Sequence, residues 1–233
     1  MLFRQLFEPQ SSTYTYLVGC ADSGEAALID PVLETAERDL AELGALGLSL
    51  RFTIETHIHA DHVTGASALR DRTGCRCAVP ALSGADRADI AVTEGEAIRV
   101  GKLDIHPLHT PGHTDDHHCY FIEDGDGGRI FTGDALLIDG CGRTDFQNGD
   151  SAALYASVRE KIFSLPPDTL VYPGHDYNSR HVSSVAQERE RNPRLGGGRT
   201  VEEFIAIMAG LNLPPPKKID IAVPANRRCG APD

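Results

Sequence analysis

Short apolar runs predict strands along most of the chain. The runs are rich in β-branched and aromatic residues and end at glycine, proline or aspartate, which is typical of strands. The predicted strands cover residues 13–19, 25–30, 50–56, 78–80, 96–100, 103–108, 119–122, 129–132 and 169–172. A tight turn at Asp22-Ser23-Gly24 joins the first two as a hairpin, and residues 124–128 form a similar glycine-rich turn.

Apolar residues at a spacing of three or four predict helices between these strands. The predicted helices cover residues 34–46, 63–70, 150–164, 179–191 and 201–210. Ser151 is a candidate N-cap for the third helix. Strands interrupted by helices predict an α/β protein with two packed sheets and helices outside them.

One domain is predicted for residues 1–233, because the length suits one core and no internal repeat is present. The glycines at residues 196–198 form a link too short for a domain boundary. Residues 195–233 are therefore expected to form a C-terminal helix and a short arm, extended from Pro214 onward. No run of 18 apolar residues occurs, so no membrane span is expected.

Charge and cysteine content narrow the class of protein further. The net charge of −12 disfavours a nucleic-acid partner, since phosphate backbones are bound by basic surfaces. The first seven residues carry one base and no long apolar run, which argues against a signal peptide. The six cysteines are scattered through a chain that needs no disulfides to fold, so we expect mostly reduced thiols in a cytoplasmic protein.

Four residues of metal-ligand type lie within six positions: His57, His59, Asp61 and His62. They occupy the turn between a predicted strand and a predicted helix, where side chains can converge without breaking a ladder. Alternation directs His57 and His59 to the same side. Imidazole and carboxylate suit iron, zinc or manganese. The alternative is a surface loop that is merely rich in histidine.

Three further ligand-type residues each follow a glycine at a predicted strand end: Gly112-His113, Gly133-Asp134 and Gly174-His175. Glycine lets the backbone turn sharply where ligands must converge. Four such turns in succession predict a metal centre far more specifically than one would.

The order Thr-His-Ile-His-Ala-Asp-His, Gly-His-Thr, Gly-Asp and Gly-His resembles the metallo-β-lactamase superfamily. The resemblance covers roughly residues 10–180 and implies an αββα sandwich with the metal site at one edge of the two sheets. The superfamily contains hydrolases, nucleases and redox enzymes, so this fold alone does not fix an activity.

A narrower resemblance, to the persulfide dioxygenases, rests on residues 56–65, 139–147, 172–177 and 211–230. It implies oxidation of glutathione persulfide with O₂ to sulfite and glutathione, in sulfide detoxification. It also implies one non-haem Fe(II) per chain, held by His57, His113 and Asp134. Two imidazoles and one carboxylate leave three coordination positions free, as O₂ activation requires. The oligomeric state stays open, a homodimer included.

The remaining ligand-type residues leave two alternatives open: His59, Asp61, His62 and His175. In a persulfide dioxygenase they would orient ligands and water through hydrogen bonds. In a binuclear thioester hydrolase of the glyoxalase II type they would help to hold a second metal. The stretches at residues 141–146 and 224–229 favour the dioxygenase over the hydrolase. A long C-terminal helical region like that of the glyoxalase II substrate domain is not expected either, since few residues follow the fourth predicted helix and the glycines at 196–198. A non-enzymatic sulfur- or metal-binding module is a third interpretation.

Substrate-binding candidates follow from the chemistry of glutathione, which carries two carboxylates and an ammonium. Arginine matches a carboxylate best, so Arg143 and Arg228 are candidates for those groups, and Asp145 for the ammonium. Phe146 is a candidate for packing on the stem of glutathione, and Tyr177, two residues from His175, is a further substrate-binding candidate. The alternatives are a local Arg143–Asp145 salt bridge and a solvated Arg228. An Arg143→Ala change is expected to weaken substrate binding more than iron binding.

Cys141 is either a redox sensor or persulfide acceptor, or simply a small residue near the mouth of the site, and we favour the small residue. Five further histidines are expected to be surface or hydrogen-bonded residues: His106, His109, His117, His118 and His181.

Overall fold

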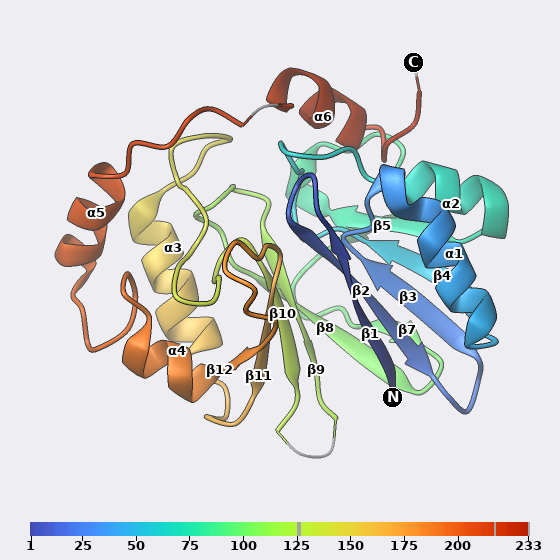
Figure 1. Ribbon diagram of the computed structural model, residues 1–233, viewed down its shortest axis with the longest axis horizontal. Helices are drawn as coiled ribbons and strands as arrows, with labels where there is room; N and C mark the ends of the chain where they lie inside the picture. The colour runs from blue at the N-terminus through green and yellow to red at the C-terminus, as the bar shows by residue number, and fades with distance from the viewer. Residues whose placement is uncertain (125–126, 217, 233) are drawn as a thin grey trace. The chain divides into compact units, whose positions relative to one another are not determined.

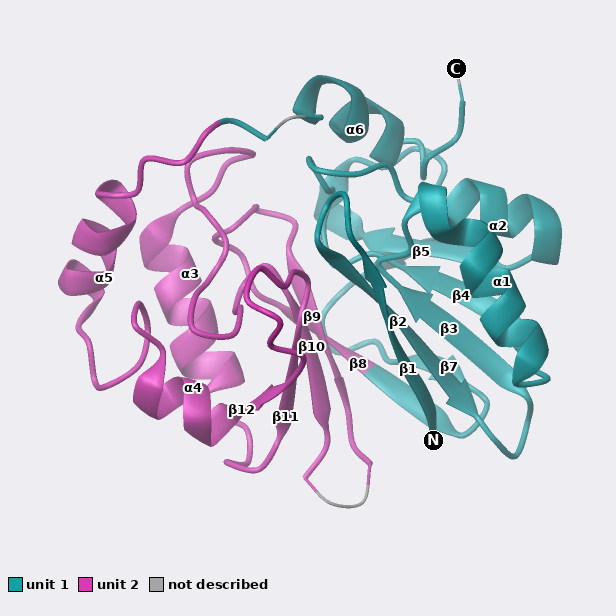
Figure 2. Ribbon diagram, viewed as in Figure 1, with its two compact units in different colours: residues 1–105, 215–233 teal, residues 106–214 magenta. Residues whose placement is uncertain are grey.

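The computed structural model describes residues 1–124, 127–216 and 218–232 (Figure 1). The chain divides into two compact units (Figure 2). Unit 1 comprises residues 1–105 and 215–233, and unit 2 comprises residues 106–214. Each unit contains strands of a sheet and its own helices.

Unit 1 is built on a six-stranded sheet in the order β1-β2-β3-β4-β5-β6. The strands are β1 (Leu2–Glu8), β2 (Thr13–Cys20), β3 (Glu25–Ile29), β4 (Ser49–Ile54), β5 (Arg76–Pro80) and β6 (Ile90–Val92). Tight turns join the first three strands, which pair antiparallel, whereas β3 to β6 pair parallel. Parallel pairing requires crossover connections, and helices α1 and α2 supply two of these.

The helical segments of unit 1 are η1 (Leu33–Thr35), α1 (Ala36–Ala45), α2 (Ala66–Thr73), η2 (Ala81–Ser83) and α6 (Ile219–Asn226). Helices α1 and α2 both contact β4 and lie side by side on one face of the sheet (Figure 1). Leu43 and Leu69 pack there with Leu28 of the sheet in one buried cluster, which confirms the helical spacing predicted for residues 34–46.

Strand β8 (Leu103–His109) passes from unit 1 into unit 2. Its first half pairs with β7 (Ile98–Val100), and its second half pairs with β9. The unit 2 strands are β9 (His118–Ile122), β10 (Arg129–Gly133), β11 (Leu170–Pro173) and β12 (Ser183–Ser184). Strands β10 and β11 are parallel, so that Asp134 and His175, just after them, lie at the same end of this sheet.

The helical segments of unit 2 are α3 (Ser151–Ser157), which continues as the π-helical turn η3 (Val158–Ile162), α4 (Val185–Arg191) and α5 (Val201–Ala209). The predicted stripe Leu154, Val158 and Ile162 is buried against Ile130 and Val171 of the sheet. A capping box between Thr200 and Glu203 begins α5.

The structure corrects several boundaries. Residues 219–226, expected to be extended, form helix α6. The helix expected at residues 179–191 begins only at Val185, because Ser183 and Ser184 pair with β11. Asp150, not Ser151, caps α3 by accepting the Ala153 N–H at 2.9 Å. Part of the predicted turn at 124–128 and the last residue of the arm lie outside the described residues.

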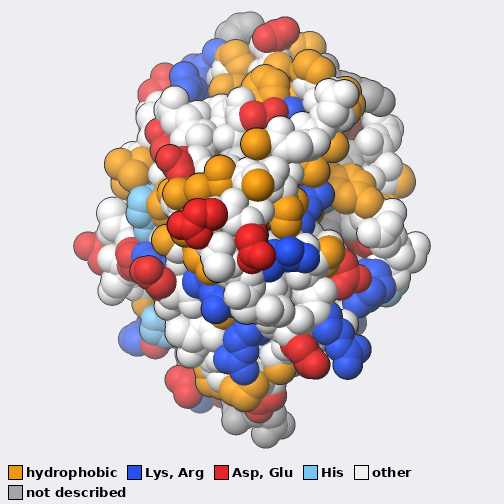
Figure 3. All heavy atoms as spheres, turned by 90° about the vertical axis from the view of Figure 1, so that its left-hand side faces the viewer, with side chains coloured by type: hydrophobic (Ala, Val, Ile, Leu, Met, Phe, Trp, Pro, Cys, Tyr) orange, Lys and Arg blue, Asp and Glu red, His pale blue; other side chains and the backbone are white. Residues whose placement is uncertain are grey.

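All six cysteines are free and buried, as expected for reduced thiols. Among the described residues, none of the helices has the length and apolar character needed to cross a membrane. Lys and Arg side chains are interspersed with Asp and Glu on the face shown in Figure 3.

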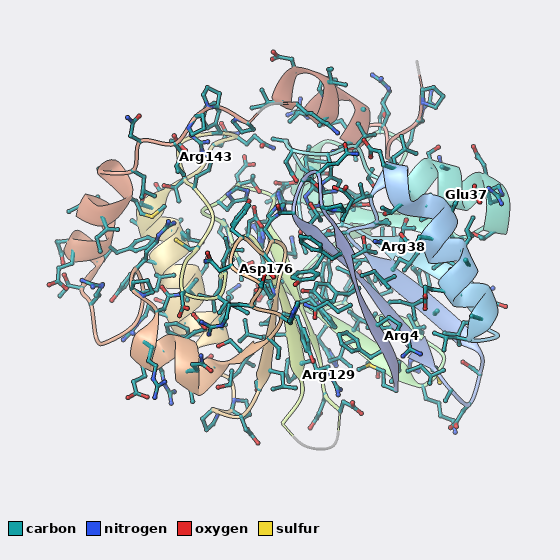
Figure 4. The ribbon with its side chains drawn as sticks, in the orientation of Figure 1. Arg4, Glu37, Arg38, Arg129, Arg143 and Asp176 are labelled. Atoms are coloured by element: carbon teal, nitrogen blue, oxygen red, sulfur yellow. The ribbon has the colours of Figure 1, made fainter. Side chains whose placement is uncertain are left out.

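Asp39 of α1 provides a test of the stability of unit 1, because its carboxylate is fully buried and pairs with Arg38. Figure 4 labels Arg38 on this helix. Burial raises the pKa of Asp39 to about 6, although Arg38 opposes the shift. The folded-state pKa lies above the unfolded value of about 3.9, so the folded protein binds the Asp39 proton more tightly than the unfolded chain does. The stability gained from that proton is complete below about pH 4 and is lost as pH rises through about 6. An Asp39→Asn variant should therefore gain about 2–3 kcal/mol relative to wild type between about pH 4 and pH 8.

Urea unfolding of wild type and Asp39→Asn at about pH 4 and about pH 8 measures this difference in the free energy of unfolding. Glu37→Gln on the same helix is the control, because Glu37 is exposed and pairs with Arg72 (Figure 4). An Asp39→Asn gain that does not change with pH would contradict the prediction.

Candidate metal centre

The ligand-bearing turn of unit 1 occupies residues 55–65, between β4 and α2. Asp30, at the end of β3, anchors the start of this turn. Its two carboxylate oxygens accept the Thr56 N–H at 2.7 Å and the Thr56 hydroxyl at 2.9 Å. Asp30 is buried and adopts a φ of 50°, a conformation that costs a non-glycine residue about 1 kcal/mol or more. The hydrogen bonds to Thr56 offset that cost.

His57 follows directly and is buried. Its Nδ1 lies 2.9 Å from the Thr56 hydroxyl oxygen. The single hydroxyl hydrogen of Thr56 is donated to Asp30, so the Nδ1–H of His57 must donate to Thr56. This tautomer leaves the lone pair on Nε2, the atom with which His57 can bind a metal.

His59 faces two buried carboxylates. Its Nε2 lies 3.1 Å from Asp30 Oδ1 and 3.5 Å from Glu55 Oε2. Burial alone would lower the pKa of His59, but the Asp30 charge and the hydrogen bonds outweigh it and raise the pKa well above its ordinary value. Among the described residues, the buried Nδ1 of His59 has no hydrogen-bond partner.

Asp61 and His62 complete the turn. His62 Nδ1 lies 3.0 Å from Asp61 Oδ2, and Thr13 donates its hydroxyl to the same oxygen at 3.3 Å. The buried Nε2 of His62 finds no partner within the described part of the chain. Candidate ligand atoms of His59, Asp61 and His62 lie within 4.8 Å of one another. This geometry suits either a metal or ordered water.

In unit 2, two predicted histidines converge on one carboxylate oxygen of Asp134. Oδ2 of Asp134 lies 3.5 Å from His113 Nε2 and 3.4 Å from His175 Nε2. His113 donates its Nδ1–H to the carbonyl of Arg143 at 2.7 Å, which leaves the lone pair on Nε2. The two imidazole nitrogens and the carboxylate thus lie as a metal site requires.

Two glycines create the space for this convergence. A Cβ at Gly142 would lie 2.5 Å from the Asp134 carbonyl and 2.8 Å from His113 Nδ1. A Cβ at Gly174 would lie 2.8 Å from Asp134 Oδ1. Any side chain at either position would displace a predicted ligand.

His117 supports Asp134 in a way that its place in the sequence does not reveal. The Asp134 N–H donates to His117 Nε2 at 3.1 Å, and His117 Nδ1 lies 2.9 Å from the Thr110 hydroxyl. His117 is a buried hydrogen-bonded histidine, as expected, but its partner belongs to the predicted ligand set.

Arg143 is bound within unit 2. Its guanidinium donates to both carboxylate oxygens of Asp145 at 2.6 and 2.8 Å and to the Pro214 carbonyl at 2.6 Å. It also lies 4.4 Å above the Phe146 ring. The hydrogen bond from Arg143 lowers the pKa of Asp145. The local salt bridge between Arg143 and Asp145 is therefore present. Arg143, labelled in Figure 4, is also bound to the segment that follows α5.

The other substrate candidates lie in different surroundings. Tyr177 is 68% exposed, and its ring stacks on His175 with 5.8 Å between centroids. Arg228, in unit 1, lines a cavity of about 600 Å³ beside α2 and α6. Cys141 is buried with its sulfur 3.7 Å from Met208 Sδ, and burial raises its pKa to about 11. A thiol with that pKa is a poor nucleophile, which favours Cys141 as a structural residue.

Comparison with known proteins identifies the class of protein to which this fold and these ligand-bearing turns belong. Residues 9–175 match the family model of the Metallo-beta-lactamase superfamily. The chain therefore belongs to that superfamily, which confirms the predicted αββα fold class.

Closer relatives identify the family. The chain is 53% identical to the persulfide dioxygenase ETHE1, mitochondrial, of Mus musculus, over 99% of this chain and 89% of that protein. The crystal structure of ETHE1 from Myxococcus xanthus superposes with a TM-score of 0.95 at 53% identity, covering 99% of this chain and 100% of that one. The chain belongs to the persulfide dioxygenase family, which confirms the predicted enzyme class.

A more distant relative represents the competing interpretation. The hydroxyacylglutathione hydrolase of Cereibacter sphaeroides is 37% identical over 79% of this chain and 71% of that protein. The chain is thus less similar to this hydrolase, in both identity and coverage, than to the persulfide dioxygenases.

Proposed function

We propose that the protein oxidises glutathione persulfide with O₂ to sulfite and glutathione, in sulfide detoxification. One Fe(II) per chain is held by His57, His113 and Asp134. The 53% identity to a persulfide dioxygenase over 99% of the chain carries this proposal. The proposal includes a cytoplasmic location, no nucleic-acid or membrane partner, and an oligomeric state that stays open, a homodimer included. The word mitochondrial is part of the name of the mouse relative.

The residues present fit Fe(II). His57 and His113 both donate Nδ1–H to a protein oxygen, which orients the ring and makes Nε2 the metal-binding atom. Asp134 adds the carboxylate of a two-histidine, one-carboxylate set. When bound, Fe(II) supplies a redox-active ion with positions free for O₂ and for a sulfur ligand.

The other ligand-type residues orient this set through hydrogen bonds: His59, Asp61, His62 and His175. Asp30 and Thr56 fix the start of the turn, and Asp30 also binds His59 Nε2 at 3.1 Å. His59 Nδ1 and His62 Nε2 are buried and have no hydrogen-bond partner in the described part of the chain, so both are available to water or to a second metal. A second metal would make the site resemble that of the hydrolases, which is why metal content is part of the test.

Arg143, Asp145, Phe146, Tyr177 and Arg228 remain the proposed contacts to glutathione. Asp145 and Tyr177 expose most of their side chains, 59% for Asp145. Both can therefore meet a ligand without rearrangement. The Arg143 guanidinium lies over the Phe146 ring and is held there by Asp145, which limits the entropy lost on binding a carboxylate.

Oxygen uptake with glutathione persulfide, measured together with metal content, tests the proposal. Consumption of O₂ and formation of sulfite by protein with about one iron per chain are expected. S-lactoylglutathione serves as the competing substrate, and zinc-loaded protein serves as the inactive control. Hydrolysis of S-lactoylglutathione by protein with two metals, without O₂ uptake, would instead identify a hydrolase.

A further inference from the structure

Asn226, the last residue of α6, is buried against the ligand-bearing turn of unit 1. Its side-chain amide donates to the carbonyls of His59 and His62, both at 2.9 Å. Its Oδ1 accepts the Thr64 N–H, also at 2.9 Å. One side chain, more than 160 residues away in sequence, thus satisfies three backbone groups of the turn.

The residues after Asn226 strengthen the same contact. The Cys229 carbonyl accepts the Ser67 N–H of α2 at 2.9 Å. Gly230 adopts a φ of 74°, and a Cβ there would lie 2.2 Å from the Thr64 carbonyl. Only glycine allows the backbone to approach the turn this closely. Residues 226–230 are therefore fitted closely to the turn.

The last residues of the turn are paired, since the Leu33 N–H donates to the Val63 carbonyl at 2.9 Å and the Gly65 N–H to the Pro31 carbonyl at 2.8 Å. The stretch from His57 to His62 lies outside the described strands and bridges, so its carbonyls need another donor. Buried carbonyls without a donor cost about 1–3 kcal/mol each, so the turn without Asn226 would rotate its peptide planes to find other donors. Rotation about the His59 and His62 peptides would move the neighbouring imidazoles. A metal site tolerates displacements of only about 0.5 Å.

We propose that Asn226 is a positioning residue for the metal centre. Asp30 fixes the start of the turn through Thr56, and Asn226 fixes its end, so the residues from His57 to His62 are held between two buried side chains. The proposal rests on the proposed metal-binding function of this turn. Asn226 also lies outside residues 9–175, the part shared with the superfamily model.

The test compares Asn226→Ala with Ala222→Gly. Ala222 is buried in the same helix, and its methyl side chain cannot form a hydrogen bond with the turn. Replacing it with glycine therefore weakens α6 without removing the hydrogen bonds of Asn226. For Asn226→Ala we expect iron affinity, measured by chelator competition, to fall about 10- to 100-fold. In metal-free protein we expect faster hydrogen exchange at the Thr64 amide. Ala222→Gly should lower Tm while leaving iron affinity and Thr64 exchange within about twofold of wild type.

Asn226→Asp adds a pH profile that the neutral Asn226→Ala change lacks, and urea unfolding of the metal-free variant at each pH separates lost stability from lost iron affinity. An ionised carboxylate faces two carbonyls and repels them, whereas a protonated carboxyl can donate to one. Its iron affinity relative to wild type should therefore rise as pH falls from about 8 to about 6.

Unchanged iron affinity in Asn226→Ala, or an equal loss in Ala222→Gly, would overturn the proposal. Failure of the wild-type protein to bind iron would count against the proposed function instead. In that case Thr64 exchange would still report whether Asn226 holds the turn.

Discussion

Asp134→Ala is expected to leave the protein folded but nearly free of iron, with kcat/KM for glutathione persulfide reduced beyond the roughly 10- to 100-fold typical of residues that only orient a ligand. Asp134 is the carboxylate on which His113 and His175 converge at 3.5 and 3.4 Å. An alanine leaves two imidazoles in unit 2 with no anion between them. Imidazoles alone do not reproduce the charge of the two-histidine, one-carboxylate set.

Iron per chain, measured after desalting, and O₂ uptake are the two readouts. Asp139→Asn is the control, because Asp139 follows Asp134 on the same loop but pairs with Arg180 at 2.7 Å near the surface, and asparagine tolerates its φ of 57°. The control should keep its iron and its activity, since exposed pairs contribute about 0–1 kcal/mol. Full iron content in Asp134→Ala would remove this residue from the ligand set.

The sequence predicted the ligand-bearing turns because their information is local. Each turn combines a strand end, a glycine and a ligand-type residue within a few positions. Gly174 shows the reason: a Cβ there would lie 2.8 Å from Asp134 Oδ1, so the glycine and the ligand are needed together. The same local patterns predicted most strands and the first helix.

What the sequence could not show depends on contacts between distant segments. Asn226 reaches His59 across 167 positions. Residues 211–230 carry part of the family resemblance, but that resemblance does not show which of them contacts the ligand-bearing turn. Helix α6 contains Pro224, which is unfavourable inside a helix, so local propensity favoured an extended arm. The partners of Arg143 include backbone carbonyls of residues 213 and 214, which carry no side-chain signature.

Short strands were missed for a related reason. Strand β6 has three residues and β12 has two, too few for a period-2 pattern to be recognised. Their pairing depends on the neighbouring strands β5 and β11, which present free edges to them.

Replacing Arg143 distinguishes the role of its side chain from the role of its backbone carbonyl. The side chain binds Asp145 and the Pro214 carbonyl, whereas the backbone carbonyl holds His113 Nδ1 at 2.7 Å. Arg143→Ala removes the first set of contacts and keeps the second. We therefore expect iron content to stay near that of wild type, while KM for glutathione persulfide rises about 10- to 100-fold, the loss typical of a charge-assisted hydrogen bond.

A lower Tm is expected as well, because the segment following α5 loses its tie to the guanidinium. Arg180→Ala is the control, because Arg180 also forms an ion pair, with Asp139, but that pair lies near the surface. Steady-state kinetics, iron analysis and thermal unfolding of both variants separate the outcomes. If Arg143→Ala had less iron and a lower kcat while KM stayed constant, Arg143 would stabilise the loop around His113 and would not contact the substrate. A higher KM with retained iron is the result expected if Arg143 binds a carboxylate of the substrate. Loss of the hydrogen bonds to the carbonyls of residues 213 and 214 alone would lower Tm without changing the dependence of the rate on persulfide concentration.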